Sequence, residues 1–230
     1  MISPRQIIEQ NRKVYNAIAA HFSQTREFVW ADLKPLAKYT RDGDTVLDLG
    51  CGNGRLYQIF ADLQVRYVGI DQSEELIALA KKKFPEARFL VGNMLDTRVT
   101  EQSVDVVYCI AAFQHIPTTE LRLQVLREIK RVLKPGGTLI MTNWNLYSDW
   151  ARKKYTGDEQ GDYYIPWKTS FGKNLGTRYY HGFLLEELLD LTEQTGFEMC
   201  EQYYVKRGEV ASIGNGNNII SIAKPVEKSD

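Results

Sequence analysis

The chain has 230 residues, 43% of them hydrophobic and 25% charged, and its 29 basic side chains balance 29 acidic ones. This length and composition suit one α/β domain with a sizeable core, and the zero net charge leaves no overall basic footprint for nucleic acid. Because no apolar run approaches the roughly 18 residues of a membrane span and the first residues lack a signal-peptide core, we expect a cytoplasmic protein without membrane contact.

The spacing of apolar residues predicts helices first and then an alternation of strands and helices. Residues 5–39 are predicted to form two helices, because Val14, Ile18 and Phe22 fall on one face of the first. Strands are predicted at 45–49, 66–70, 88–91, 104–110, 138–143, 198–205 and 217–224. Helices are predicted at 54–62, 73–83, 119–133 and 183–195.

This order predicts one doubly wound α/β domain with a seven-stranded, mostly parallel sheet. Its expected parts are an N-terminal helical cap (1–40), a core (41–144), an insertion after the fifth strand (145–182), and a final helix with a strand pair (183–230). The insertion breaks the alternation, and long stretches of this kind are usually functional or mobile. We therefore interpret it as a lid.

A glycine turn in the core predicts a ligand site. The strand at 45–49 runs into Gly50, Gly52 and Gly54, directly before a predicted helix. Without side chains there, a ligand can approach the backbone closely. The next strand ends in Asp71, about 20 residues after the first glycine, where an acid usually holds a ribose diol. The core is therefore predicted to bind a cofactor that contains a nucleoside.

Glycine spacing distinguishes between cofactor classes. Dinucleotide binders use G-x-G-x-x-G, whose third glycine would fall at Arg55. This chain instead has G-x-G-x-G preceded by Asp48, an acid well placed to meet a cationic amine. The pattern resembles motif I of the class I S-adenosylmethionine-dependent methyltransferases, which have a Rossmann-like fold. The alternative is a glycine turn that holds no cofactor.

The resemblance implies a set of cofactor residues. Asn93 stands where the family commonly has an acid on the adenine amino group, and its side-chain carbonyl can accept the same hydrogen bond. Cys51 is interpreted as a small residue that fills the turn, with a reactive thiol as the alternative. The three cysteines form no C-x-x-C pair, which argues against a disulfide framework and a zinc site. The cofactor residues expected are Asp48, Gly50, Cys51, Gly52, Asp71, Gln72, Asn93, Met94 and Ile110.

Longer motifs narrow the resemblance to one family. These motifs are Tyr15–Arg26, Cys109–His115, Asn143-Trp144, Ile165–Lys168 and Arg178-Tyr-Tyr-His181. They resemble the tRNA methyltransferases that esterify a 5-carboxymethyl group on the wobble uridine, whose eukaryotic members work with a small zinc-binding activator subunit. The likeness extends from about residue 11 to the last strand and implies tRNA as a partner. Gln114 departs from it, because members usually carry a second histidine there.

The nucleophile decides which residues are needed for catalysis. A carboxylate acceptor, with a pKa near 4, is ionised at neutral pH and needs no general base. It needs a cation to hold it, and Arg26 and Arg178 are the candidates. His115 would orient the acceptor or the methyl donor, with helix capping as the alternative, and Trp144 would line the pocket. His181 is a candidate from the same motif as Arg178, with a purely structural role as its alternative.

Two questions remain open from the sequence. Residues 151–182 hold six Lys or Arg and three Asp or Glu, with seven aromatic rings between them. This mixture suits a single-stranded nucleotide, and equally a lid whose rings pack on the domain. The alternative functions are methylation of a small metabolite, which the zero net charge favours, and S-adenosylmethionine binding without catalysis.

Overall fold

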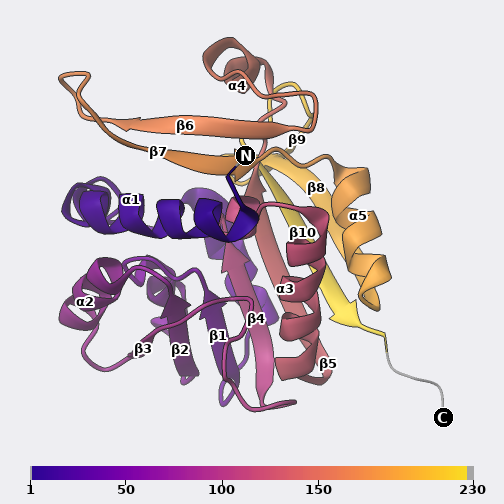
Figure 1. Cartoon of the computed structure of the whole chain (residues 1–230). Coiled ribbons are helices and arrows are strands. Elements are labelled where there is room, and N and C mark those ends of the chain that lie inside the picture. The colour runs from indigo at the N-terminus through magenta and orange to yellow at the C-terminus, as the bar shows by residue number, and fades with distance from the viewer. Residues whose placement is uncertain (1, 227–230) are drawn as a thin grey trace.

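A central sheet of eight strands in the order β3-β2-β1-β4-β5-β10-β8-β9 organises the molecule (Figure 1). The computed structural model describes residues 2–226. The strands of this sheet are β1 (Thr45–Leu49), β2 (Arg66–Asp71), β3 (Arg88–Val91), β4 (Val104–Ile110), β5 (Leu133–Trp144), β8 (Phe197–Lys206), β9 (Glu209–Ala211) and β10 (Asn218–Pro225). The helices are α1 (Pro4–Thr25), α2 (Glu74–Lys83), α3 (Thr119–Val132), α4 (Asp149–Lys154) and α5 (Leu185–Gln194), with 3-10 helices η1 (Ala31–Tyr39), η2 (Arg55–Phe60) and η3 (Phe113–His115).

The pairing of the strands confirms the predicted fold class. The first five strands are joined by parallel pairs, and β10 runs antiparallel to both β5 and β8. The sheet has eight strands where seven were predicted, because the short β9 pairs with the end of β8. Three residues are too few to show an apolar alternation, so β9 carries no strand signal of its own.

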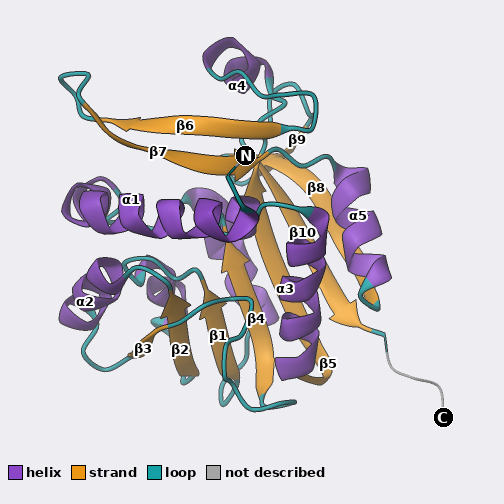
Figure 2. Cartoon of the chain, viewed as in Figure 1, coloured by secondary structure: helices purple, strands orange, loops and turns teal. Residues whose placement is uncertain are grey.

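Helices cover both faces of the sheet (Figure 2). Two apolar cores lie between the sheet and these helices. Successive side chains of a strand point to opposite faces. Leu47 and Leu49 of β1 therefore pack in the core under α3 and α5, whereas Val46 packs in the core under α2. Burial on both faces explains why β1 is almost continuously apolar in sequence. No helix among residues 2–226 is long and apolar enough to cross a membrane.

Two predicted helices are 3-10 helices in the structure. The second N-terminal helix is η1, which contains Pro35, and a proline has no amide hydrogen for the helical ladder. The helix predicted at 54–62 is the shorter η2, which follows Gly54 in a left-handed conformation. The fifth strand begins at Leu133, five residues earlier than predicted.

The insertion at 145–182 contains α4 and an antiparallel hairpin of β6 (Asp162–Lys168) and β7 (Asn174–His181). The hairpin forms a sheet of its own and lies along α1 (Figure 1). A Cβ on Gly176 would lie 2.6 Å from the Val14 side chain, so the hairpin backbone packs directly on α1. Together, α1 and the hairpin cover the carboxyl ends of the parallel strands.

Candidate cofactor and acceptor site

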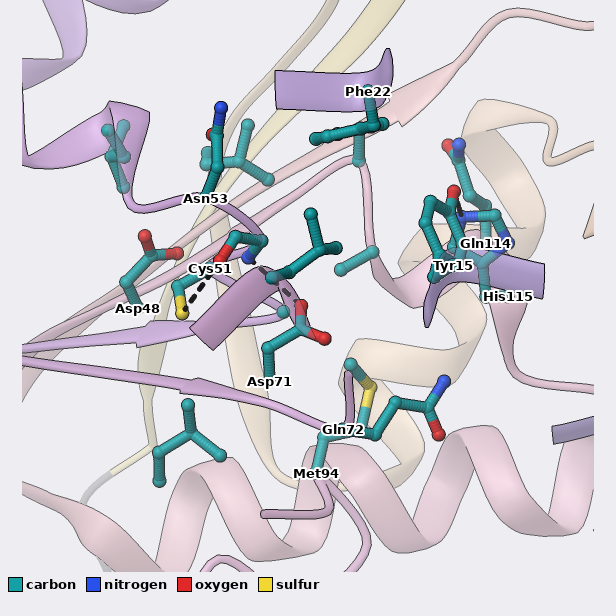
Figure 3. A pocket seen from close by; sticks show the side chains of 18 of the residues that line it. Tyr15, Phe22, Asp48, Cys51, Asn53, Asp71, Gln72, Met94, Gln114 and His115 are labelled. Carbon is teal, nitrogen blue, oxygen red and sulfur yellow. Dashed lines mark hydrogen bonds between the residues drawn. The ribbon is translucent and has the colours of Figure 1, made fainter. Parts of the chain in front are cut away.

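A pocket opens at the carboxyl ends of β1, β2 and β4, beneath α1 and the hairpin. This is the switch point of the sheet, where the strand order reverses between β1 and β4. His115, Tyr15 and Gln114 lie on one side of the pocket, Asp48 and Cys51 lie on the other, and Asp71 lies between them (Figure 3). We call these sides the acceptor end and the cofactor end.

The structure brings nearly all the residues predicted from sequence to this pocket. All nine expected cofactor residues line it. Four of the five residues expected to take part in catalysis also line it, namely Arg26, His115, Trp144 and Arg178. His181, the fifth, is not among the lining residues and lies 5% exposed in a polar cluster.

The glycine turn leaves open backbone at the cofactor end. Gly50 and Gly52 have φ angles of +72° and +55°, which side chains rarely adopt. A Cβ on Gly50 would also overlap the Cβ of Ala112, so any side chain would force a shift. Asp71 accepts hydrogen bonds from the backbone N–H groups of Gly52 (2.9 Å) and Ser73 (2.8 Å). Its remaining lone pairs can accept the hydroxyls of a ribose.

The other cofactor residues fit an S-adenosylmethionine site in the same way. Asp48 accepts a hydrogen bond from the Tyr67 hydroxyl at 2.6 Å, and burial raises its pKa to about 7. A cationic amine nearby would favour its ionised form. The side-chain carbonyl of Asn93 accepts a hydrogen bond from the Leu95 N–H at 2.9 Å, which leaves one lone pair of Oδ1 for an adenine amino group. Burial raises the pKa of the Cys51 thiol, so the group stays protonated and fills the turn.

His115 is neutral, and both of its ring nitrogens are engaged. Nδ1 lies 2.8 Å from the Tyr179 carbonyl oxygen, and Nε2 lies 2.8 Å from the Tyr15 hydroxyl. Because a carbonyl only accepts, Nδ1 carries the hydrogen, and Nε2 accepts from the Tyr15 hydroxyl. Burial lowers the pKa of His115 to about 3. At neutral pH this residue therefore has no free lone pair for a substrate proton.

Three arginines line the pocket: Arg26, Arg55 and Arg178. None of them forms a salt bridge with another side chain in the described part of the chain. Arg178 is 3% exposed, and its guanidinium lies over the rings of Trp167 (4.8 Å) and Tyr180 (5.1 Å). Arg26 lies over the same Trp167 ring at 5.5 Å. Burying a cation is costly unless an anion pairs with it, so this arrangement favours an anionic ligand.

The electrostatics keep these cations charged at neutral pH. Burial lowers the pKa of Arg26 from its ordinary value, and burial together with Arg26 lowers the pKa of Arg55 to about 10. For Arg178, burial opposes the charge, but the hydroxyl oxygens of Tyr15 and Tyr180 raise its pKa overall. Arg178 is thus the most firmly cationic group at the acceptor end.

His181 belongs to a cluster behind the acceptor end. Its Nδ1 lies 2.7 Å from Asp162, and its Nε2 lies 2.9 Å from Glu187. Arg122 lies 3.5 Å from Glu187 and donates to the Tyr179 hydroxyl at 3.1 Å. Burial opposes the charge of His181, but its two carboxylate partners raise its pKa. The cluster ties the hairpin to α3 and α5 and does not contact the pocket.

Sequence reasoning gave no role to several lining residues. Tyr15, Phe22, Gln114, Trp167 and Tyr180 stand inside the quoted motifs, whereas Trp30 and Arg55 lie outside them. Membership of a motif was the one signal available, because the partners of these side chains are far away in sequence.

Within residues 2–226, no group of three or more His, Cys, Asp or Glu side chains is arranged to hold a metal ion.

Several known proteins share the sequence pattern. A family model described as a methyltransferase domain matches residues 47–141. The chain is 33% identical over 159 residues to the tRNA (carboxymethyluridine(34)-5-O)-methyltransferase of Saccharomyces cerevisiae, covering 69% of this chain but only 56% of that protein. It is 28% identical over 214 residues to the Schizosaccharomyces pombe protein of the same name, covering 85% of this chain and 92% of that protein.

Solved structures share the fold. An S-adenosylmethionine-dependent methyltransferase of Methanosarcina mazei superposes with a TM-score of 0.70 at 24% identity, over 84% of this chain and 98% of that one. A Haloferax volcanii methyltransferase, solved in complex with the Trm112 activator, superposes with a TM-score of 0.73 at 21% identity, over 96% of this chain and 99% of that one. At these identities the likeness concerns the fold.

Proposed function

We propose that this chain, which belongs to the class I S-adenosylmethionine-dependent methyltransferases, esterifies the carboxylate of a 5-carboxymethyl group on the wobble uridine of tRNA. Its cofactor is S-adenosylmethionine. The observation that carries the proposal is the buried Arg178, which has no carboxylate partner in the described structure and lies beside His115, whose two ring nitrogens are both engaged in hydrogen bonds.

The chemistry of the acceptor end favours a carboxylate over a hydroxyl or an amine. Those other acceptors lose a proton on methylation, which calls for a base nearby. His115 is engaged by Tyr15 and Tyr179, the carboxyl group of Asp48 lies at the cofactor end, and Asp71, between the two ends, accepts hydrogen bonds from the backbone N–H groups of Gly52 and Ser73 (Figure 3). A carboxylate is already ionised at neutral pH and needs only to be held with one oxygen free. The guanidinium fork of Arg178 suits that task.

S-adenosylmethionine supplies an electrophilic methyl group when it is bound, and the side chains and backbone of this chain do the positioning. Asp71 would hold the ribose hydroxyls, Asp48 the amino group and Asn93 the adenine, with open backbone at the glycine turn. Arg178 would hold the acceptor carboxylate, and Arg26, which lies over the same Trp167 ring, is a second cation for this task. Alignment of two reactants in this way can lower a barrier by roughly 7–11 kcal/mol.

The hairpin offers a surface for RNA beside the pocket. Lys168 and Lys173 flank the hairpin turn and are exposed, and the Phe171 ring between them is 98% exposed. Cations that pair with phosphates and a ring that stacks on a base suit single-stranded RNA, such as an anticodon loop. This local surface supports tRNA as the substrate despite the zero net charge of the chain.

A small activator subunit is a further part of the proposal. Its support is the shared fold with the Haloferax volcanii methyltransferase that was solved with its Trm112 activator.

A methyltransferase for a small metabolite is the second candidate function. The observation that favours it is that α1 and the hairpin cover the pocket and restrict access to it.

The test is a methylation assay on defined acceptors. The purified chain, with and without an added Trm112-type subunit, is incubated with S-adenosylmethionine and tRNA that carries 5-carboxymethyluridine at the wobble position. We expect transfer of one methyl group to that nucleoside, detected by mass spectrometry and removed by mild alkali, as esters are. The same tRNA with an unmodified wobble uridine is the control. Methylation of the control, or an alkali-stable product, would overturn the carboxylate assignment.

A further inference from the structure

A chain of hydrogen bonds connects three elements around the acceptor end. Arg178 Nη1 donates to the Tyr15 hydroxyl oxygen at 3.4 Å, and the Tyr15 hydroxyl lies 2.8 Å from His115 Nε2. His115 Nδ1 then lies 2.8 Å from the Tyr179 carbonyl. Asn11 fixes the Tyr179 end of this series of hydrogen bonds, because its side chain pairs with both the N–H and the C=O of Tyr179. These hydrogen bonds thus join α1, η3 and β7.

The shortest contacts set the direction of donation in this network: His115 Nδ1 lies 2.8 Å from the Tyr179 carbonyl oxygen, and its other neighbour, the donor Asn11 Nδ2, is farther away at 3.3 Å. The Tyr179 carbonyl can only accept, so His115 must carry its hydrogen on Nδ1, and its Nε2 must accept. The Tyr15 hydroxyl therefore donates its one hydrogen to His115 Nε2. Its oxygen is left as an acceptor, which matches the guanidinium donor of Arg178. Tyr15 thus cannot donate to a substrate while it holds this place.

The same contact determines which edge of Arg178 is free. Tyr15 accepts one of the two Nη1 hydrogens, while Nε is buried without a hydrogen-bond partner among the described residues. The side-on pairing of a guanidinium with a carboxylate uses Nε together with Nη2. The rings of Trp167 and Tyr180, at 4.8 and 5.1 Å, restrict tilting of the guanidinium plane, and the Tyr15 contact opposes rotation within it.

We propose that Tyr15 is a positioning residue that fixes Arg178, so that its Nε–Nη2 edge pairs with the acceptor carboxylate. His115 acts in this arrangement as the acceptor that orients the Tyr15 hydroxyl. The inference rests on the proposed function, since it concerns the carboxylate that is to be methylated. It assigns a task to His115 that requires no proton transfer.

The test compares Tyr15→Phe, which keeps the ring and removes the hydroxyl, with the wild-type chain on tRNA that carries 5-carboxymethyluridine. We expect kcat to fall about 10- to 100-fold because the fork is misplaced, with less than about a threefold change in the dissociation constant of S-adenosylhomocysteine. Tyr164→Phe is the matched control, because its ring lies on the outer face of the same hairpin and is 55% exposed. It should keep wild-type kinetics.

A double-mutant cycle shows whether Tyr15 acts through Arg178. In the background of Arg178→Lys, which lacks the fork, Tyr15→Phe should add less than about a threefold loss. Fully additive losses, or an unchanged kcat in Tyr15→Phe, would overturn the proposal. A wild-type chain that fails to methylate this tRNA would instead count against the proposed function.

A second readout does not depend on activity. In 15N-labelled protein the Nε–H signal of Arg178, assigned by its loss in Arg178→Lys, should be sharp in the wild type and broadened in Tyr15→Phe. An unchanged signal would contradict the positioning role even if the acceptor were another molecule.

Discussion

The carboxylate of Asp71 accepts a hydrogen bond from the backbone N–H of Gly52 at 2.9 Å, so the two parts of the cofactor motif hold each other in place. Its second oxygen accepts from the Ser73 N–H at 2.8 Å, at the start of α2. Burial raises the pKa of Asp71, and these backbone donors oppose that rise. The acid is therefore oriented before any ligand arrives, which is the condition for a selective ribose contact.

Replacing Asp71 with alanine should weaken cofactor binding. The loss of hydrogen bonds to a charged acceptor typically costs about 1.5–3 kcal/mol, so we expect the affinity for S-adenosylhomocysteine to fall roughly 10- to 150-fold. Asp71→Asn keeps one carbonyl acceptor and should lose less. Isothermal titration calorimetry measures both variants, and thermal unfolding measures the weakening of the glycine turn. Equal affinity in wild type and Asp71→Ala would remove this residue from the site.

The cofactor end was predictable because its signals are local. The glycines of the turn follow one apolar strand, and Asp71 ends the next, so a short stretch of sequence contains the strand, the turn and the acid. The contact between Tyr15 and His115 could not be found in this way. The two residues are 100 positions apart, and only the packing of α1 against η3 and β7 brings them together.

Strand alternation separates two residues that share a motif. Arg178 and His181 are three positions apart on β7, and side chains at odd separations point to opposite faces of a strand. Arg178 accordingly lines the pocket, whereas His181 joins Asp162 on the other face. Applying this alternation to the Arg-Tyr-Tyr-His motif would have separated the two in advance, had the strand at 174–181 been predicted.

The cluster around His181 should make stability depend on pH. The pKa of His181 is raised in the folded chain, so its contribution is complete below its unfolded pKa of about 6.5 and is lost as the pH rises through the folded value. We expect His181→Gln to lower the unfolding temperature clearly at pH 6 and progressively less toward pH 9. Differential scanning calorimetry at both pH values provides the comparison. A deficit that stays constant between them would show that the charge of His181 does not stabilise the fold.

The hairpin turn should contribute to tRNA binding through charge. Lys168→Glu with Lys173→Glu should weaken binding of tRNA and reduce the slope of log affinity against log salt by about one unit per lysine. The cofactor affinity should not change, because neither lysine lines the pocket. Lys81→Glu with Lys82→Glu on α2 is the matched control, because both lysines are exposed and lie on another element. Equal weakening by the two pairs would indicate general charge attraction instead of a defined surface.

The dependence of methyl transfer on pH tests the carboxylate chemistry. If the acceptor is a carboxylate held by Arg178, it stays ionised throughout, and the single-turnover rate should be flat from about pH 6 to 8. His115 should add no titration in that range, because burial lowers its pKa to about 3. His115→Gln should lower the rate by a factor that does not change with pH, since it disturbs Tyr15 but removes no base. Arg178→Lys keeps the charge and loses the fork, so it should still impair turnover.

Rapid-quench measurements across this range, with tRNA and cofactor saturating, provide the rates. The informative control is Arg26→Lys. Arg26 is a second cation over the same Trp167 ring, and its guanidinium donates to the Thr25 carbonyl and not to Tyr15. Its profile should also be flat, because no proton moves in the step. A rising limb near pH 6.5 in the wild type that disappears in His115→Gln would show that His115 accepts a proton. In that case the acceptor would be a hydroxyl or an amine, and a small metabolite would become the better candidate.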